Sequence, residues 1–206
     1  MKQLVIYVHG KGGNVSEAEH YISFFPESEV KGFDYHSEYP WEAKKEFSEY
    51  YDTQVKGYDS VILIANSIGA FFSMSSLADK NIAKAMLISP IVNMEKLITD
   101  MIMWANVTET QLQEKQEIPT AFGETLSWKY LCYVRENPIK WDIPTCILYG
   151  ENDNLTSIET LSEFAEKTNF SVTVMKNGEH WFHTDEQMKF LDKWIINSIY
   201  GERIIY

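Results

Sequence analysis

The chain has 206 residues, of which 45% are hydrophobic and 23% are charged, a composition that excludes a disordered protein. Its 18 Lys and Arg residues against 30 Asp and Glu residues give a net charge of −12, which repels nucleic-acid phosphates and anionic lipid surfaces. We therefore expect one globular domain, 1–206, with neither nucleic acid nor a membrane as a partner.

Apolar runs that predict strands alternate along the chain with amphipathic stretches that predict helices. The predicted strands are Leu4–Val8, Val30–Tyr35, Ser60–Ala65, Ala85–Ile88, Thr145–Tyr149 and Ser171–Met175. The predicted helices of this alternation are Ser16–Phe25, one that begins at Pro40, Gly69–Ala78, Ile158–Lys167 and Thr184–Ile199. A helix supplies the long crossover that a parallel neighbour needs, so the chain is expected to be α/β, with a doubly wound, mostly parallel six-stranded sheet flanked by helices.

The stretch from Val92 to Trp141 interrupts this alternation and is interpreted as an insertion, roughly residues 92–141. Apolar residues recur at helical spacing from Met94 to Ile102, and an aromatic group follows at Trp128–Tyr133. We expect two helices and no strand here, forming a short cap. Met94, Met101 and Trp104 are expected to bind substrate, although the same apolar stripe is also explained by helix packing alone.

Ala65-Asn66-Ser67-Ile68-Gly69 lies where a predicted strand passes into a predicted helix. In that context it resembles the G-x-S-x-G nucleophile elbow of the α/β-hydrolase family, with Ala65 in place of the first glycine. Small neighbours are needed because the nucleophilic serine adopts a strained backbone conformation. The alternative is that Ser67 only caps the helix.

Two further residues complete the family's chain order of Ser, Asp and His. Asp153 follows one predicted strand in Gly150-Glu151-Asn152-Asp153, and His180 follows the next in Gly178-Glu179-His180. Such a histidine takes the serine's proton, and the carboxylate fixes the imidazole tautomer. Glu151 is an alternative acid, and His183 competes with His180. The two histidines could also bind a metal ion, but no third ligand with suitable spacing accompanies them.

His9-Gly10-Lys11-Gly12-Gly13 is similar to the family's H-G-x-G loop. The resemblance implies an oxyanion hole formed by the backbone N–H groups of Lys11 and Ile68. It also implies that the strands, numbered along the chain, lie in the order 2-1-3-4-5-6. Phosphate binding by the glycines is disfavoured because neither the Walker spacing nor G-x-G-x-x-G is present.

The resemblance implies a serine hydrolase that cleaves a small ester or thioester, without a cofactor or metal ion. The alternative from another class is a non-catalytic protein that keeps the pocket and binds a ligand. Cys132 and Cys146 show neither metal-ligand nor disulfide-framework spacing, and no signal-like apolar run begins the chain, so a cytoplasmic location is expected.

Overall fold

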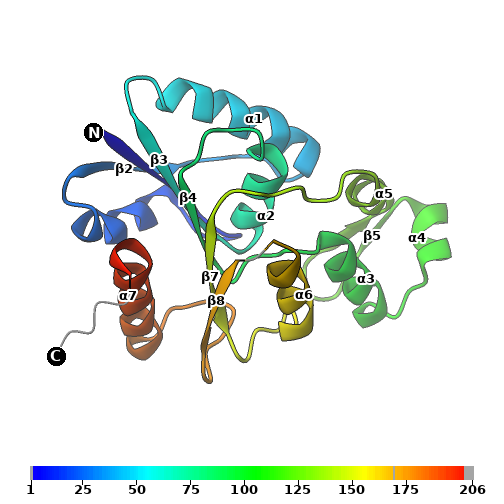
Figure 1. Cartoon of the computed structure of the whole chain (residues 1–206). Coiled ribbons are helices and arrows are strands. Elements are labelled where there is room, and N and C mark those ends of the chain that lie inside the picture. The colour runs from blue at the N-terminus through cyan, green and yellow to red at the C-terminus, as the bar shows by residue number, and fades with distance from the viewer. Residues whose placement is uncertain (1, 169, 202–206) are drawn as a thin grey trace. The chain divides into compact units, whose positions relative to one another are not determined.

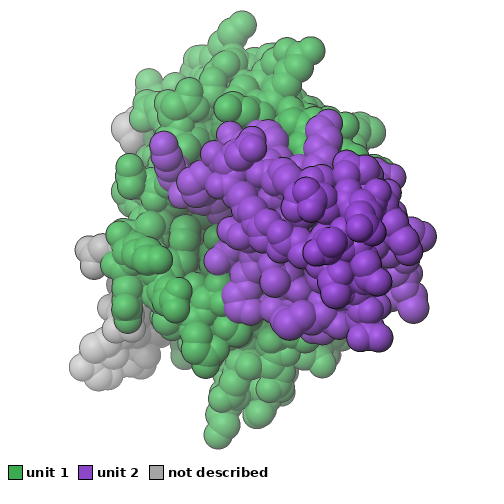
Figure 2. Space-filling model, turned by 90° about the vertical axis from the view of Figure 1, so that its right-hand side faces the viewer, with its two compact units in different colours: residues 1–92, 141–206 green, residues 93–140 purple. Residues whose placement is uncertain are grey.

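The computed structural model describes residues 2–168 and 170–201 (Figure 1). The chain divides into two compact units, shown in green and purple in Figure 2. The larger unit contains residues 1–92 and 141–206, and the smaller unit contains residues 93–140. No helix within the described residues has the length and apolar character to cross a membrane.

The larger unit is built on a six-stranded sheet in the order β2-β1-β3-β4-β7-β8, with every neighbouring pair parallel. The strands are β1 (Gln3–Val8), β2 (Ser28–Phe33), β3 (Ser60–Asn66), β4 (Lys84–Ile88), β7 (Thr145–Gly150) and β8 (Ser171–Met175). The predicted fold class is therefore confirmed, and so is the strand order that the resemblance implied. Because all six strands run the same way, the loops after β1, β3, β7 and β8 emerge at one edge of the sheet.

Helices cover both faces of this sheet (Figure 1). Helices α1 (Pro40–Gln54), α2 (Ser67–Ser76) and α6 (Ile158–Thr168) lie on one side, and η1 (Val15–Phe24) and α7 (Asp185–Tyr200) lie on the other. Successive side chains along a strand point to opposite faces of the sheet. On the face that η1 and α7 cover, Tyr7 and Ile64 join a buried cluster with Tyr21 of η1 and Trp194 of α7. Burial of apolar side chains on both faces explains why the central strands read as continuous hydrophobic runs.

The helix expected at Ser16–Phe25 is present as η1, which has the tighter 3₁₀ geometry. Its start is fixed by a reciprocal cap, in which Asn14 Oδ1 accepts from Ser16 N and Glu17 Oε1 accepts from Asn14 N. This cap places the Glu17 carboxylate directly after the glycine-rich loop, where a methyl group on Gly13 would lie 2.7 Å from Glu17 Oε1.

The smaller unit corrects two expectations, because it contains three helices and a pair of strands. Its elements are α3 (Met94–Trp104), α4 (Glu109–Lys115), β5 (Glu117–Pro119), β6 (Thr125–Ser127) and α5 (Trp128–Glu136). Strands β5 and β6 pair antiparallel over only three residues each, too short for a period-two pattern to be visible in the sequence. Within this unit Arg135 forms ion pairs with both Glu95 and Glu109, joining α5 to α3 and α4.

Candidate active site

Ser67 stands at a sharp turn between β3 and α2. Its φ of +49° lies in the left-handed region, which a residue with a Cβ rarely adopts. Close neighbours disfavour larger residues here. A methyl on Gly69 would lie 2.2 Å from the His9 carbonyl oxygen, and one on Gly10 would make a tight contact of 3.2 Å with Ser67 Cβ. Ala65 is fully buried at the position where the family motif has glycine. The sequence thus holds Ser67 in a strained turn with small residues around it.

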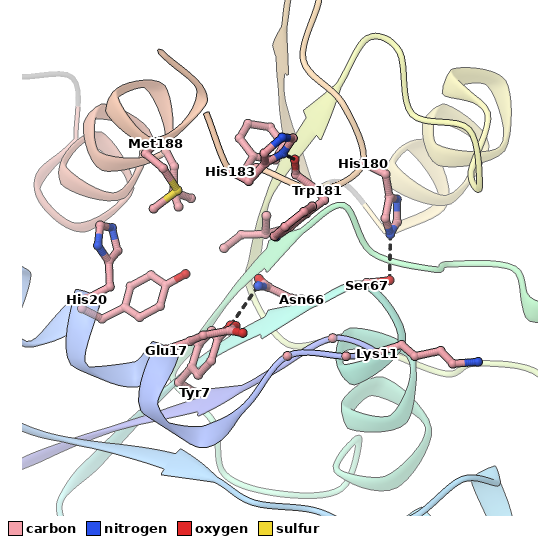
Figure 3. Close-up of a pocket in the computed structure, with 17 residues that line it drawn as sticks. Tyr7, Lys11, Glu17, His20, Asn66, Ser67, His180, Trp181, His183 and Met188 are labelled. Atoms are coloured by element: carbon pink, nitrogen blue, oxygen red, sulfur yellow. Dashed lines mark hydrogen bonds between the residues drawn. The ribbon is translucent and has the colours of Figure 1, made fainter. Parts of the chain in front are cut away.

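A line of hydrogen bonds connects Ser67, His180 and Asp153. Ser67 Oγ lies 2.8 Å from His180 Nε2, and Figure 3 shows the two side chains facing each other. His180 Nδ1 lies 2.7 Å from Asp153 Oδ2. The Asp153 side chain is fully buried, and the His180 side chain is 14% exposed. Three residues from separate strand ends therefore meet in the geometry of a nucleophile, a base and an orienting acid.

Asp153 uses its two carboxylate oxygens for different partners. While Oδ2 faces His180, Oδ1 accepts from the backbone N–H groups of Leu155 and Thr156 at 2.8 and 3.0 Å. Asp153 therefore caps the turn that follows it and orients the histidine at the same time. Burial, followed by the nearby Asp153 carboxylate, raises the pKa of Tyr149 to about 12. The protonated Tyr149 hydroxyl donates to the Thr156 carbonyl oxygen and braces the same turn.

Glu151 and His183, the alternatives to Asp153 and His180, lie in other environments. Glu151 is exposed, and its Oε2 accepts from the backbone N–H of Asn177, a residue with φ of +57°. His183 stacks on Trp181, and its Nδ1 lies 2.7 Å from the Trp181 carbonyl oxygen. In the described part of the chain no cluster of three His, Cys, Asp or Glu side chains could hold a metal ion. Ser67 provides no side-chain cap for α2, whose N-cap residue is Asn66.

Gly10 and Lys11, in the glycine-rich loop after β1, line the same cavity as Ser67. Figure 3 shows the Lys11 side chain extending away from the cavity, so the loop presents its backbone there. Ile68 directly follows the serine in the first turn of α2, where backbone N–H groups have no partner within the helix. The oxyanion-hole role of Lys11 and Ile68 stays a prediction from the resemblance.

A cavity of about 700 Å³ extends from Ser67 along the sheet face that η1 and α7 cover. Its other walls are formed by side chains that the sequence analysis did not select. They are Tyr7, Glu17, His20, Tyr21, Asn66, Ile88, Trp181, Phe182, Met188 and Leu191. Glu17 could have been noticed as the partner of Asn14 in a capping box, but nothing in the sequence indicates that η1 and α7 converge at the serine.

The three residues expected to bind substrate from the cap belong to the smaller unit. Met94 is buried in α3, Met101 is half-buried, and Trp104 is exposed. The residues that line the described cavity all belong to the larger unit. Contact of Met94, Met101 and Trp104 with substrate stays a prediction.

Comparison with known proteins gives structural matches only. No protein-family model matches the sequence, and no curated protein matches it. Among solved structures, Est1E from Butyrivibrio proteoclasticus superposes with a TM-score of 0.73 at 14% identity, over 96% of this chain and 87% of that one. Alpha/beta hydrolase domain-containing protein 10 from mouse gives a TM-score of 0.73 at 15% identity, over 95% of this chain and 89% of that one.

The chain has the α/β-hydrolase fold. An esterase from Pyrococcus furiosus is also similar, with a TM-score of 0.58 at 18% identity over 96% of this chain and 80% of that one. In an α/β-hydrolase fold, the nucleophile elbow and the triad partners stand at strand ends along the same edge of the sheet. Ser67, Asp153 and His180 occupy those places here, after β3, β7 and β8.

Proposed function

We propose that this protein is a serine hydrolase that cleaves a small ester or thioester through an acyl-enzyme on Ser67. The observation that carries the proposal is the continuous line from Ser67 Oγ to His180 Nε2 at 2.8 Å and from His180 Nδ1 to Asp153 Oδ2 at 2.7 Å. A serine hydroxyl is a weak nucleophile by itself, and this line supplies a base to accept its proton and an acid to orient that base.

The first half of the reaction forms the acyl-enzyme. His180 Nε2 takes the proton from Ser67 Oγ while Oγ attacks the carbonyl carbon of the substrate, and the carbonyl electrons move to its oxygen. The backbone N–H groups of Lys11 and Ile68 stabilise that oxyanion; one such donor is worth about 2.7–4 kcal/mol of barrier elsewhere. The bond to the leaving oxygen or sulfur then breaks, and His180 gives its proton to the departing alcohol or thiol.

The second half repeats this chemistry with water. His180 removes a proton from a water molecule, the hydroxide attacks the acyl carbon, and the bond to Ser67 Oγ breaks as His180 returns the proton to the serine. Asp153 stays ionised throughout and stabilises the imidazolium that forms twice per turnover. The free acid is released. Several structural neighbours are named as esterases or hydrolases, which supports this reaction class.

The test is covalent labelling of the folded protein with a fluorophosphonate, followed by peptide mass spectrometry. We expect the label on Ser67, with none in Ser67→Ala and greatly slowed labelling in His180→Ala. Ser75→Ala is the matched control because its hydroxyl, on the same helix, donates to the Phe71 carbonyl oxygen. Hydrolysis of p-nitrophenyl esters of graded chain length then defines the acyl preference. Absence of label from folded wild-type protein would overturn the proposal and favour a non-catalytic ligand-binding protein.

A further inference from the structure

Trp181, the residue directly after His180, lines the cavity that contains Ser67 (Figure 3). It is 71% exposed, more than any other large hydrophobic side chain in the described part of the chain. Trp181 takes no part in the acyl-transfer steps above. Accessible aromatic side chains in the wall of a cavity are typical of residues that contact a ligand, because they offer a large apolar surface in a defined position.

The Trp181 side chain is held in place by its neighbours in the segment between His180 and α7. Its indole ring stacks on the His183 imidazole, with 4.3 Å between the ring centroids and 18° between the ring planes. The backbone N–H of His183 donates to Gln187 Oε1 at 3.0 Å, which attaches His183 to the first turn of α7. Phe182, between the two stacked residues, is buried in the core cluster and anchors the segment. The indole is therefore oriented before any substrate binds.

The stack leaves one face of the indole accessible. His183 covers one of the two faces, and a side chain that is 71% exposed cannot also be covered on the other. His183 lines the same cavity as Trp181, and Figure 3 shows Trp181 between His183 and His180. The accessible face is flat, and its residue is adjacent in the chain to the base that acts on the ester. A planar group of a bound ester can therefore reach it.

We propose that Trp181 determines specificity, and that the cavity selects esters carrying an aromatic ring, which stacks on the accessible indole face. Two aromatic rings attract each other beyond the effect of the area they bury, and a platform that is already oriented loses little entropy on binding. The apolar walls at Ile88 and Leu191 suit the carbon skeleton of such a substrate. His183 is a positioning residue, which acts on the substrate through Trp181. The inference rests on the proposed function and specifies its substrate class.

Matched esters test the inference by comparing a phenyl ring with a cyclohexyl ring, which is also apolar but has no π system and is not planar. Ethyl 3-phenylpropanoate is paired with ethyl 3-cyclohexylpropanoate, and 2-phenylethyl butanoate with 2-cyclohexylethyl butanoate, so that both sides of the scissile bond are sampled. Values of kcat/KM are measured by pH-stat and divided by the rates of hydroxide-catalysed hydrolysis. We expect the phenyl ester of at least one pair to be preferred by about two- to tenfold, the range for one aromatic pair.

Variants identify the residue responsible. Trp181→Leu keeps an apolar side chain without a ring and should abolish the phenyl preference, whereas Trp181→Phe should retain part of it. His183→Ala removes the support of the indole and should reduce the preference at least by half. Tyr200→Leu is the matched control, because Tyr200 is an exposed aromatic residue of α7 that does not line the cavity. It should leave the preference unchanged. All four side chains replaced are exposed, and melting temperatures check that the variants fold.

A normalised rate for the phenyl ester that is equal to or below that of the cyclohexyl ester in both pairs would overturn the inference. A phenyl preference that Trp181→Leu leaves intact would also overturn it. Isothermal titration of Ser67→Ala protein with the same esters separates this failure from failure of the proposed function. Tighter binding of a phenyl ester without any hydrolysis by the wild type would support the aromatic site and overturn only the hydrolase. Hydrolysis without preference would overturn only the aromatic site.

Discussion

Gly69 of helix α2 lies so close to His9, the residue directly after β1, that a methyl group on Gly69 would be 2.2 Å from the His9 carbonyl oxygen. This contact ties the helix that follows Ser67 to the loop expected to hold the oxyanion. The nearest atom, the His9 carbonyl oxygen, belongs to the backbone, so it cannot move aside as the end of a flexible side chain could.

The first prediction concerns this contact. Alanine in a helix interior is normally favoured over glycine by about 1 kcal/mol, but at position 69 we expect Gly69→Ala to lower the free energy of unfolding by about 1–3 kcal/mol. Urea denaturation measures the change, and fluorophosphonate labelling reports any displacement of Ser67. Ser75→Ala, in the same helix, should change stability by less than about 0.5 kcal/mol. A stabilised Gly69→Ala protein would show that the contact is not tight in solution.

The second prediction separates the two candidate acids. Asp153→Asn places an amide opposite His180 Nδ1 and favours the wrong imidazole tautomer, so kcat should fall by a factor of the order of 10⁴, as in other serine triads. Glu151→Gln keeps an oxygen that can accept from Asn177 N and should change kcat by less than about threefold. Steady-state hydrolysis of a p-nitrophenyl ester measures both. The reverse ranking would assign the acid to Glu151.

The third prediction is that Ser67 and His180 act as one unit. Ser67→Ala should reduce kcat by several orders of magnitude, and adding His180→Ala should cost little more, because the base has no function without the nucleophile. The two single variants and the double variant are compared with the same ester. Multiplicative losses would instead mean that the residues contribute independently.

The fourth prediction concerns metal dependence. The described residues offer no cluster of three metal-binding side chains, and His183 contacts Trp181 rather than facing Ser67. Dialysis against EDTA should therefore leave ester hydrolysis unchanged, measured before and after treatment with the same substrate. Inactivation that added zinc reverses would support the alternative in which His180 and His183 bind a metal ion.

The sequence predicts most of the sheet because β1, β3, β4 and β7 are buried on both faces and read as unbroken apolar runs. The place of Asp153 follows from the same signal, since Asp153 stands three residues after β7. His180 instead follows β8, a strand in which only Met175 is buried. The strand order needed the resemblance to a known family, because periodicity locates a strand without naming its neighbours.

Two kinds of feature could not be predicted from the sequence. Helix α4 has seven residues and the paired strands beside it three each, too few for periodicity, although Thr108 and Gln111 form a capping box that marks the helix start. The cavity depends on tertiary packing: Glu17 and Met188 are 171 positions apart and meet only because η1 and α7 cover the same sheet face. No local pattern indicates such a meeting.

The last prediction compares two methionines as determinants of acyl-chain length. Met188 of α7 and Ser67 line the same cavity. Met188→Ala should therefore enlarge the cavity and shift the preferred p-nitrophenyl ester toward longer acyl chains. One methylene in an apolar pocket is worth about 1–3 kcal/mol, so the ratio of kcat/KM between neighbouring chain lengths should change roughly tenfold. Labelling of Ser67 by a small fluorophosphonate should hardly change, because Met188 does not touch the reacting atoms.

Met101→Ala makes the same chemical change in α3, where Met101 is half-buried, and tests the expectation that the cap binds substrate. If Met101 contacts the substrate, the chain-length profile should shift with little loss of stability. If it only packs within its own unit, the melting temperature should fall and the profile should stay that of the wild type. Truncating a fully buried methionine typically costs about 2–5 kcal/mol, which is the upper bound for the half-buried Met101. The melting temperature and the chain-length profile are measured for both Met188→Ala and Met101→Ala. Together they decide whether the preference for acyl-chain length depends on α7 alone or also on the expected cap. A Met188→Ala protein with an unaltered profile would show that the cavity beside α7 does not hold the acyl chain.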